Sequence, residues 1–320
     1  MQRKESRRMG SFLMRKSWLS RTAWAILTIS CLPFAGSESW GQQAPLSVEE
    51  VIRAARDVLD KVRDGKGSLE HYLFIDLHGR VTETYKDCYN LAFIGPPRGA
   101  YRRDYKELSL LNGGQPPEQK RNMDALGSDF EYYSNGAYEM EFSVDRREAS
   151  IRERYLEAFT DDYKGFHPLF QTSFFLHDGP ELNQFRLTSY KAGVYTIERP
   201  YGPGINKQSV LILAIDEKRG FSIQEVIKRT REPSGNGFVY SRTRIEPVEW
   251  AKGIWLPRTI ESEHYRLAQS DPTKVKVILR ERANFRDLKL NIGLRPADLE
   301  ITLPKGTELD DERTGITTWN

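Results

Sequence analysis

The side chains that could do chemistry in this chain lack the spacings that the common reactions require. None of its five histidines forms the i, i+4 pair of a helical zinc site. His167 and His177 share one aromatic region, which would allow a metal or acid–base role, but histidines at loop or helix ends are the simpler interpretation. The others are His71, His78 and His264.

The acidic clusters and the short motifs indicate no reaction either. Asp161–Asp162 and Asp310–Glu312 could bind calcium, but neither has the Asp-x-Asp-x-Asp-Gly order of calcium loops, which favours solvated acidic turns. The chain has no Gly-x-Ser-x-Gly elbow, no glycine-rich phosphate loop and no paired-cysteine motif. We therefore predict a non-enzymatic protein with no metal and no cofactor, with an enzyme of unrecognised type as an alternative.

Two further positions carry reactive or charged groups. Cys88 lies in a strand-like run, which predicts a buried or half-buried structural thiol rather than a nucleophile. Arg102 and Arg103 follow a turn rich in glycine and proline and could bind an anionic head group. Positions at a solvated strand edge would explain the two arginines as well.

The first 41 residues have the three parts of a secretory signal peptide. Basic residues come first, an apolar run from Ala23 to about Gly36 follows, and small residues lead to a cleavage site that we place after Gly41. The apolar run is roughly half of the ~20 residues that span a bilayer. We predict a periplasmic or secreted protein without an integral membrane span, in which residues 42–320 form a single domain.

Two other routes of export have weaker support. Arg7–Arg8 suggests the twin-arginine route, but no Phe-Leu follows at close spacing. Lipidation at Cys31 is disfavoured because Leu32–Phe34 is still apolar and position 28 is threonine.

Removal of residues 1–41 changes the charge of the protein. The whole chain has 48 Lys and Arg against 45 Asp and Glu, and the removed segment holds seven of the basic and two of the acidic residues. The remainder has 41 against 43, a net charge of −2, so no excess positive field indicates nucleic acid as a partner. Cys88 is then the single thiol, which excludes an intramolecular disulfide.

One helix and then many strands are predicted. Ser47 and Glu50 form a capping box, and an apolar stripe with helical spacing continues to Val62, so the helix should end near Asp64–Gly65. The stripe consists of Val48, Val51, Ile52, Ala55, Leu59 and Val62.

The first group of strands covers residues 72–77, part of 81–94, 100–105 and 130–133, with Leu111–Gly127 as a long surface loop. Ser134–Gly136 is a strong hairpin signal. Tyr138, Met140, Phe142 and Val144 then alternate with polar residues, as in a half-buried strand. Residues 155–182 break this pattern and predict one or two short helices that cross the sheet.

The second group is a series of β-ribbons. Strands are predicted at 186–190, 194–197, 209–215, 221–227, 238–245, 254–257, 274–279 and 298–303. Turns at Asp216–Gly220, Trp250–Gly253 and Pro304–Gly306 join some of them. The fold class is therefore α+β with a meandering antiparallel sheet.

Several loose motifs carry a family resemblance over most of residues 46–314. They are Tyr101–Arg102, Ser134–Tyr138, Asp216–Phe221, Gly253–Pro257 and Leu303–Thr307 with Asp311. With these motifs the chain resembles the LolA/LolB-type periplasmic lipoprotein-carrier superfamily, and is closest to large exported relatives of unknown role in bacteria such as planctomycetes. It is longer than the simple carriers, and Leu111–Gly127 looks like an addition.

The resemblance implies an unclosed, curved half-barrel with an N-terminal helix and short helices on its concave face. Such proteins hold acyl chains and do no covalent chemistry, so the expected function is to sequester a hydrophobic ligand, a lipid or the acyl chain of a lipoprotein. The alternative is an envelope sensor or assembly protein that binds another protein with the same scaffold. The predicted ligand-lining residues, which a plain core would also explain, are Tyr138, Met140, Phe142, Phe170, Phe174, Phe221, Ile223 and Trp255.

Overall fold

The computed structural model describes most of the chain after residue 44. The described residues are 45–77, 80–95, 100–109, 130–135, 137–153, 176, 180–201, 209–230, 237–268 and 271–320. The signal peptide, the Leu111–Gly127 loop, His78, His167, His177, Phe170 and Phe174 lie outside them, so these predictions are untested.

The described residues contain one α-helix and fifteen strands. The helix is α1 (Val48–Asp60). The first strands are β1 (Asp64–Leu77), β2 (Arg80–Ile94), β3 (Ala100–Ser109), β4 (Phe130–Ser134), β5 (Tyr138–Ser143) and β6 (Glu148–Glu153). The later strands are β7 (Arg186–Lys191), β8 (Val194–Tyr201), β9 (Ser209–Asp216), β10 (Ser222–Thr230), β11 (Val239–Ala251), β12 (Ile254–Ala268), β13 (Asp271–Leu290), β14 (Glu308–Asp311) and β15 (Ile316–Trp319).

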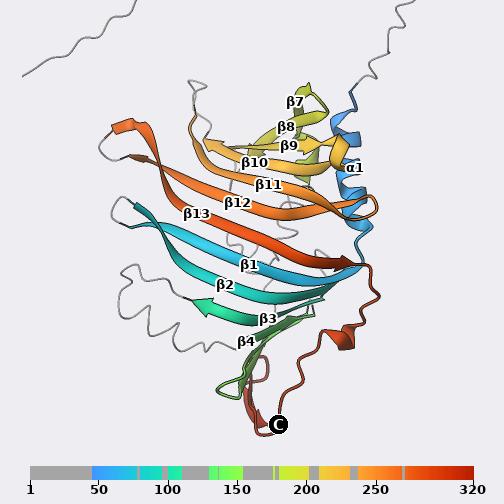
Figure 1. Ribbon diagram of the computed structural model, residues 1–320, viewed down its shortest axis with the longest axis vertical. Coiled ribbons are helices and arrows are strands. Elements are labelled where there is room, and N and C mark those ends of the chain that lie inside the picture. The colour runs from blue at the N-terminus through green and yellow to red at the C-terminus, as the bar shows by residue number, and fades with distance from the viewer. Residues whose placement is uncertain are drawn as a thin grey trace, which may run out of the picture. The chain divides into compact units, whose positions relative to one another are not determined.

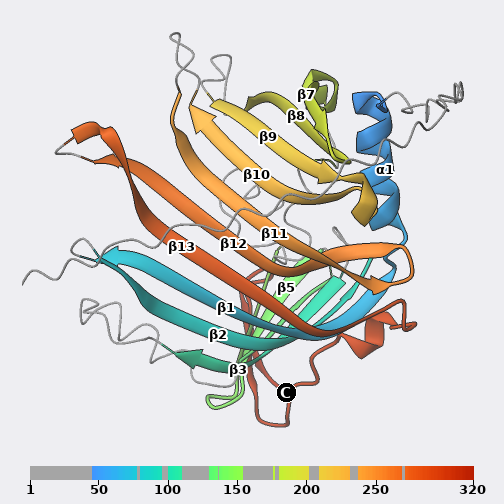
Figure 2. The same ribbon diagram turned by 45° about the horizontal axis from the view of Figure 1, so that its top comes forward.

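All fifteen strands belong to one open sheet. Their order is β15-β14-β6-β5-β4-β3-β2-β1-β13-β12-β11-β10-β9-β8-β7, so the two end strands do not meet in a closed barrel. Every pairing is antiparallel except that of β14 with β6, which is parallel. Figures 1 and 2 show the strands as one curved layer, with α1 across the ends of β9 to β12. The predicted α+β fold with an unclosed, curved antiparallel sheet is confirmed.

The two halves of the chain join at the centre of this sheet. β1 pairs with β2 on one side and with β13 on the other, so Leu69 lies between Tyr89 and Phe285. Gly65 sits on the same seam, where an added Cβ would come 2.6 Å from the Phe93 ring and 2.9 Å from the Lys289 backbone oxygen. This close approach of three strands explains the need for glycine there.

The sheet buries apolar residues on both faces. The larger cluster includes α1 and Tyr132 and covers what we call the inner face. The smaller cluster includes Tyr133, the next residue of β4, and therefore lies on the opposite, outer face, because successive strand residues point to opposite sides. Leu299 and Ile301 cover that outer face and are themselves buried.

The C-terminal segment differs from its prediction. Residues 298–303 form no strand; a 3-10 turn at Pro296–Asp298 leads into irregular backbone that lies on the outer face. Its alternating apolar residues pack on a sheet face instead of pairing at an edge, and Pro296 and Pro304 can donate no ladder hydrogen bond. The chain then adds β14 and β15, which the sequence pattern did not indicate.

The capping box of α1 is confirmed. The Ser47 backbone N–H donates to Glu50 Oε2 at 2.8 Å, and the Glu50 N–H donates to Ser47 Oγ at 3.3 Å. The helix ends at Asp60, one turn before the predicted end, because Asp64 already belongs to β1. No helix among the described residues is long and apolar enough to cross a membrane.

Most predicted strands are confirmed, with shifted bounds. β5 ends at Ser143, which leaves Val144 exposed in the following turn. β13 has 20 residues and extends far beyond the predicted 274–279. Phe221 has φ 57° and belongs to a turn, so β10 begins only at Ser222.

Candidate functional site

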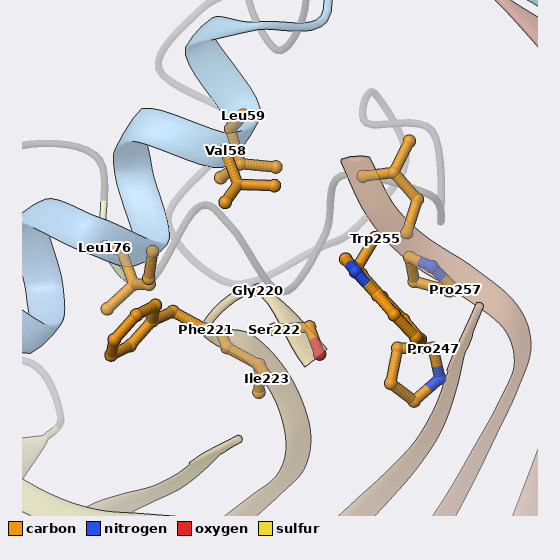
Figure 3. Close-up of a pocket in the computed structure, with 12 residues that line it drawn as sticks. Val58, Leu59, Leu176, Gly220, Phe221, Ser222, Ile223, Pro247, Trp255 and Pro257 are labelled. Atoms are coloured by element: carbon orange, nitrogen blue, oxygen red, sulfur yellow. The ribbon is translucent and has the colours of Figure 1, made fainter. Parts of the chain in front are cut away.

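An apolar pocket lies between α1 and two neighbouring β-turns of the sheet. Figure 3 shows Val58 and Leu59 of α1 on one side, and Trp255 between Pro247 and Pro257 on the other. Its volume is about 40 Å³. The lining residues are Ala55, Val58, Leu59, Leu176, Gly220, Phe221, Ser222, Ile223, Pro247, Trp255, Leu256 and Pro257.

The turn between β9 and β10 positions the floor of the pocket. Gly220 has φ 61°, and an added Cβ would lie 2.8 Å from Trp255 Cδ1, so glycine lets the turn lie flat on the indole. The Asp216 side chain holds the same turn by accepting from the Lys218 N–H at 2.9 Å and from the Gln224 amide. The Asp-x-x-x-Gly-Phe motif thus shapes a chain reversal.

The next ribbon fixes the wall of the pocket. Trp250 Nε1 donates to the backbone oxygens of Leu256 and Pro257, at 3.2 and 3.3 Å. This bond ties the end of β11 to the start of β12 and orients the strand that carries Trp255.

The structure divides the predicted ligand-lining residues between two places. Phe221, Ile223 and Trp255 meet in the inner-face pocket. Tyr138, Met140 and Phe142 belong to the outer-face cluster under Leu299 and Ile301, so they do not share a space with the first three. The alternation of β5 was predicted correctly, but the C-terminal segment covers its apolar side, and the expectation of a common inner face was wrong for these three.

A larger and more polar hollow lies at the opposite end of β10. Its volume is about 530 Å³. Arg229 there pairs with Glu198 at 3.6 Å, and the Arg199 guanidinium lies 5.3 Å from the centre of the Phe185 ring. None of the predicted ligand-lining residues that the structure describes lines it. The lining residues are Asn183, Gln184, Arg186, Glu198, Arg199, Pro200, Val210, Arg229, Thr230 and Gly237.

Arg102 and Arg103 point to opposite faces of β3. Arg102, on the outer side, donates to Asp104 Oδ1 at 2.6 Å, to Glu131 Oε2 at 3.0 Å and to the Glu300 backbone oxygen at 2.9 Å. Arg102 therefore holds the C-terminal segment on the sheet, and its charge is already paired with the carboxylates of Asp104 and Glu131. Of the two arginines, only Arg103 is left as a candidate for an anionic head group.

Arg103 lies half-buried on the inner face among tyrosine rings. Its guanidinium carbon is 5.0 Å from the centre of the Tyr101 ring, 5.4 Å from that of Tyr132 and 5.7 Å from that of Tyr89. A hydrogen bond joins it to Tyr105. Burial opposes the charged form, but the surrounding tyrosines outweigh it and raise the pKa of the guanidinium above its usual value. The sequence placed Arg103 on a strand but contained no sign of this aromatic surround.

A histidine–aspartate pair lies on the same face. His71 Nδ1 is 3.3 Å from Asp87 Oδ1. Burial lowers the pKa of His71, but the hydrogen bond and the charge of Asp87, with a further contribution from Glu281, outweigh burial, so the net shift is upward. In His264, by contrast, burial dominates and lowers the pKa.

These opposite shifts predict opposite pH dependences of stability. For His71, the contribution to the free energy of unfolding is complete below the unfolded-state pKa of about 6.5 and is lost as the pH rises through the higher folded-state pKa. We expect the stability difference between wild type and His71→Gln to shrink between pH 6 and pH 8 in urea denaturation. For His264→Gln, the difference should grow as the pH rises towards 6.5. Parallel curves for the two variants would contradict this assignment.

The remaining reactive groups behave as structural residues. Cys88 is a half-buried thiol in β2, as predicted. Within the described parts of the chain, no three His, Cys, Asp or Glu side chains gather as a metal site would need.

Comparison with known proteins gives similarity of fold at low sequence identity. No family model and no curated protein matches the chain. Similar solved structures include an outer membrane lipoprotein-sorting protein domain from Vibrio parahaemolyticus (13% identity, TM-score 0.45, 79% of this chain and 97% of that chain covered). A LolA superfamily protein from Nitrosomonas europaea is 10% identical, with a TM-score of 0.42 and coverage of 80% and 99%. A DUF1329 family protein from Desulfovibrio piger is 12% identical, with a TM-score of 0.39 and coverage of 80% and 98%.

The likeness concerns the fold alone at these identities. The relation to planctomycete-type proteins stays a prediction.

Proposed function

We propose that the protein is an exported, non-enzymatic carrier that holds a hydrophobic ligand, such as a lipid or the acyl chain of a lipoprotein, between the inner face of its sheet and the helices over it. The observation that carries this proposal is the extent of the apolar inner face. Ten neighbouring strands, from β4 through β8 in the sheet order, each contribute a buried apolar or aromatic residue to it.

The inner face is wider than its helix. Ten strands at about 4.8 Å spacing extend over roughly 43 Å. The 13 residues of α1 give a helix of about 20 Å. Among the described residues, α1 and the region with Leu176, Leu182 and Phe185 supply the cover. Apolar surface of this kind favours an apolar occupant at about 25 cal/mol per Å² buried.

The pocket under α1 is small in this structure. Its volume of about 40 Å³ is far below the ~300–1,000 Å³ of ligand pockets. A ligand therefore enters when α1 moves away from Trp255. The C-terminal end of the helix is held, because the Arg63 N–H donates to Asn291 Oδ1 at 2.8 Å and Asn291 Nδ2 donates to the Lys61 oxygen at 3.0 Å.

The N-terminal end of α1 is tied to the sheet as well. There the Leu46 N–H donates to the Tyr195 hydroxyl at 3.2 Å, and Val51 and Ile52 are buried in the inner-face cluster. We infer that α1 moves away from Trp255 as a whole when the pocket opens.

The neutral fluorescent probe N-phenyl-1-naphthylamine tests this function. We expect the wild-type protein to bind the probe and Val58→Ala, which enlarges the pocket, to bind it more tightly. Val58→Trp should fill the pocket and weaken binding by about tenfold, the equivalent of 1.4 kcal/mol. Asp57→Trp places the same ring on the exposed side of α1 and is the matched control.

Folding of each variant is checked by circular dichroism. Native mass spectrometry of protein from its own host should show a bound lipid. If the wild type neither binds the probe nor retains a lipid, the carrier function is wrong. If Val58→Trp and Asp57→Trp change probe affinity equally, the site under α1 is wrong.

A further inference from the structure

Arg103 is a cation on the inner face for which the described residues supply no carboxylate. Its contacts are the three rings of Tyr89, Tyr101 and Tyr132 and the hydrogen bond with Tyr105. Its Nε atom is buried and has no hydrogen-bond partner. Other arginines of the sheet differ: Arg152 and Arg242, for example, lie 2.7 and 2.6 Å from glutamate oxygens.

Several acidic side chains on the same face have other partners. Asp87 faces His71 at 3.3 Å. Glu139 and Glu141 both pair with Arg152, at 3.3 and 2.7 Å. The positive charge of Arg103 is therefore not neutralised by these neighbours.

Arg103 is partly out of water and has no carboxylate partner among the described residues. Burial of a charge costs several kcal/mol; the tyrosines offset this cost here, but each cation–π contact contributes only about 0.5–2 kcal/mol and brings no negative charge. Arginine cannot lose its proton at ordinary pH, so the charge persists. An anion at this position would supply the missing partner, and the low dielectric of the site would strengthen the attraction.

The groups around Arg103 suit an oxyanion. A guanidinium presents a planar fork of donors that matches a carboxylate or a phosphate. The tyrosines add hydroxyl groups: Tyr101 Oη donates to Tyr132 Oη at 3.4 Å in the buried cluster. Burial raises the pKa of Tyr89 and of Tyr132, so both keep their protons, and the Tyr132 hydroxyl is also hydrogen-bonded to Glu139.

Apolar surface continues directly from this charged centre. Leu91 is paired with Arg103 in the β2–β3 ladder, and Leu69 and Phe93 belong to the same inner-face cluster. A ligand anchored at Arg103 would thus find an apolar path beside its head group.

We propose that Arg103 and its four tyrosines bind the anionic head group, a carboxylate or a phosphate, of an amphiphile whose apolar chain lies along the inner face. This inference rests on the proposed carrier function and specifies its ligand class. It assigns the selectivity for anionic ligands to β2, β3 and β4. In the sheet, β1 and β13 separate these strands from β10, β11 and β12, which carry the α1 pocket.

Matched ligands separate the head group from the chain. Decanoate and decyl phosphate carry the anion, 1-decanol carries the same chain without charge, and inorganic phosphate carries the anion without a chain. Affinities are measured by calorimetry, because Arg103 in β3 lies four strands from the β12 residues of the α1 pocket that holds the probe. We expect the wild type to bind decanoate and decyl phosphate about tenfold or more tightly than 1-decanol, and inorganic phosphate far more weakly than decyl phosphate.

Variants of one residue test the assignment. Arg103→Gln should lose the preference for the anionic ligands by about tenfold and keep the affinity for 1-decanol. Arg103→Lys should recover part of the preference, because the charge remains without the fork. Arg146→Gln removes an equal charge from an exposed turn and should change nothing. If the glutamine variant does not fold, two other variants replace it in the same measurement. They are Arg103→Met, an apolar replacement of similar length, and Tyr132→Phe.

The outcomes distinguish this inference from the carrier function. If 1-decanol and decanoate bind the wild type equally, or if Arg103→Gln weakens both to the same degree, the head-group site is wrong while the carrier function stands. If inorganic phosphate binds as tightly as decyl phosphate, a free anion is the ligand and the amphiphile is wrong. If no ligand with a chain binds, the carrier function fails as well.

Discussion

Replacement of Leu213 by alanine is expected to lower the free energy of unfolding by about 3–4 kcal/mol. Leu213 in β9 is completely buried and lies between Ile197 of β8 and Val226 of β10 in the ladder. Neighbouring strands hold the backbone on both sides, so the site cannot collapse around the missing atoms, and a cavity adds to the lost burial. Equilibrium denaturation in urea, followed by circular dichroism, measures the change.

Leu187→Ala provides the comparison for this prediction. Leu187 lies in the edge strand β7 and is 37% exposed, so the same deletion should cost less than about 1 kcal/mol. Similar losses in the two variants would show that the ribbons from β8 to β10 are not the well-packed core that their burial indicates.

Asp64→Ala is the second substitution with a large expected effect, about 3 kcal/mol. The buried Asp64 carboxylate accepts from the Ile292 N–H at 2.7 Å and from the Gly293 N–H at 3.2 Å. The Asp64 backbone oxygen also accepts from the Asn291 N–H at 2.8 Å. Alanine would leave two donors unsatisfied at the point where β1 starts and β13 ends.

The conservative variant sharpens this test. Asp64→Asn keeps an acceptor oxygen in place and should recover part of the loss, whereas Asp57→Ala, on the exposed side of α1, should be nearly neutral. Thermal unfolding of the three variants gives the ranking. If Asp64→Ala and Asp57→Ala had the same midpoint, this junction would contribute nothing to stability.

Much of the fold could be predicted because its signals are local. The capping box at Ser47 needs four residues, and the turn at Asp216–Gly220 needs five. The strand pattern of β8 to β12 is read from alternation within each strand. Phe221, Ile223 and Trp255 line one pocket because two neighbouring turns bring them together, and their contact with a ligand stays a prediction.

The errors share a long-range cause. Alternation in β5 shows that Tyr138, Met140 and Phe142 share one side, but it does not say which side faces α1. That depends on Leu299 and Ile301, more than a hundred residues later, which cover the outer face. The parallel addition of β14 to β6 depends on the same contact.

The surroundings of Arg103 were hidden for a similar reason. Tyr89, Tyr101 and Tyr132 come from three strands, and only the registers of β2, β3 and β4 bring their rings around one guanidinium. A single sequence shows four scattered tyrosines and a pair of arginines. The opposite roles of Arg102 and Arg103 follow from a difference of one position in the strand.

The pairing of β1 with β13 leaves one edge of β1 without a partner until nearly the whole chain is present. Ser68 and Arg286, which face each other in this ladder, are 218 residues apart. The N-terminal part of an exported chain emerges first, so β1 is present before β13. Until then one edge of β1 is open, and open edges of this kind recruit strands of other molecules. The charged residues Lys66, Glu70 and Asp76 along β1 oppose such aggregation while the edge remains unpaired.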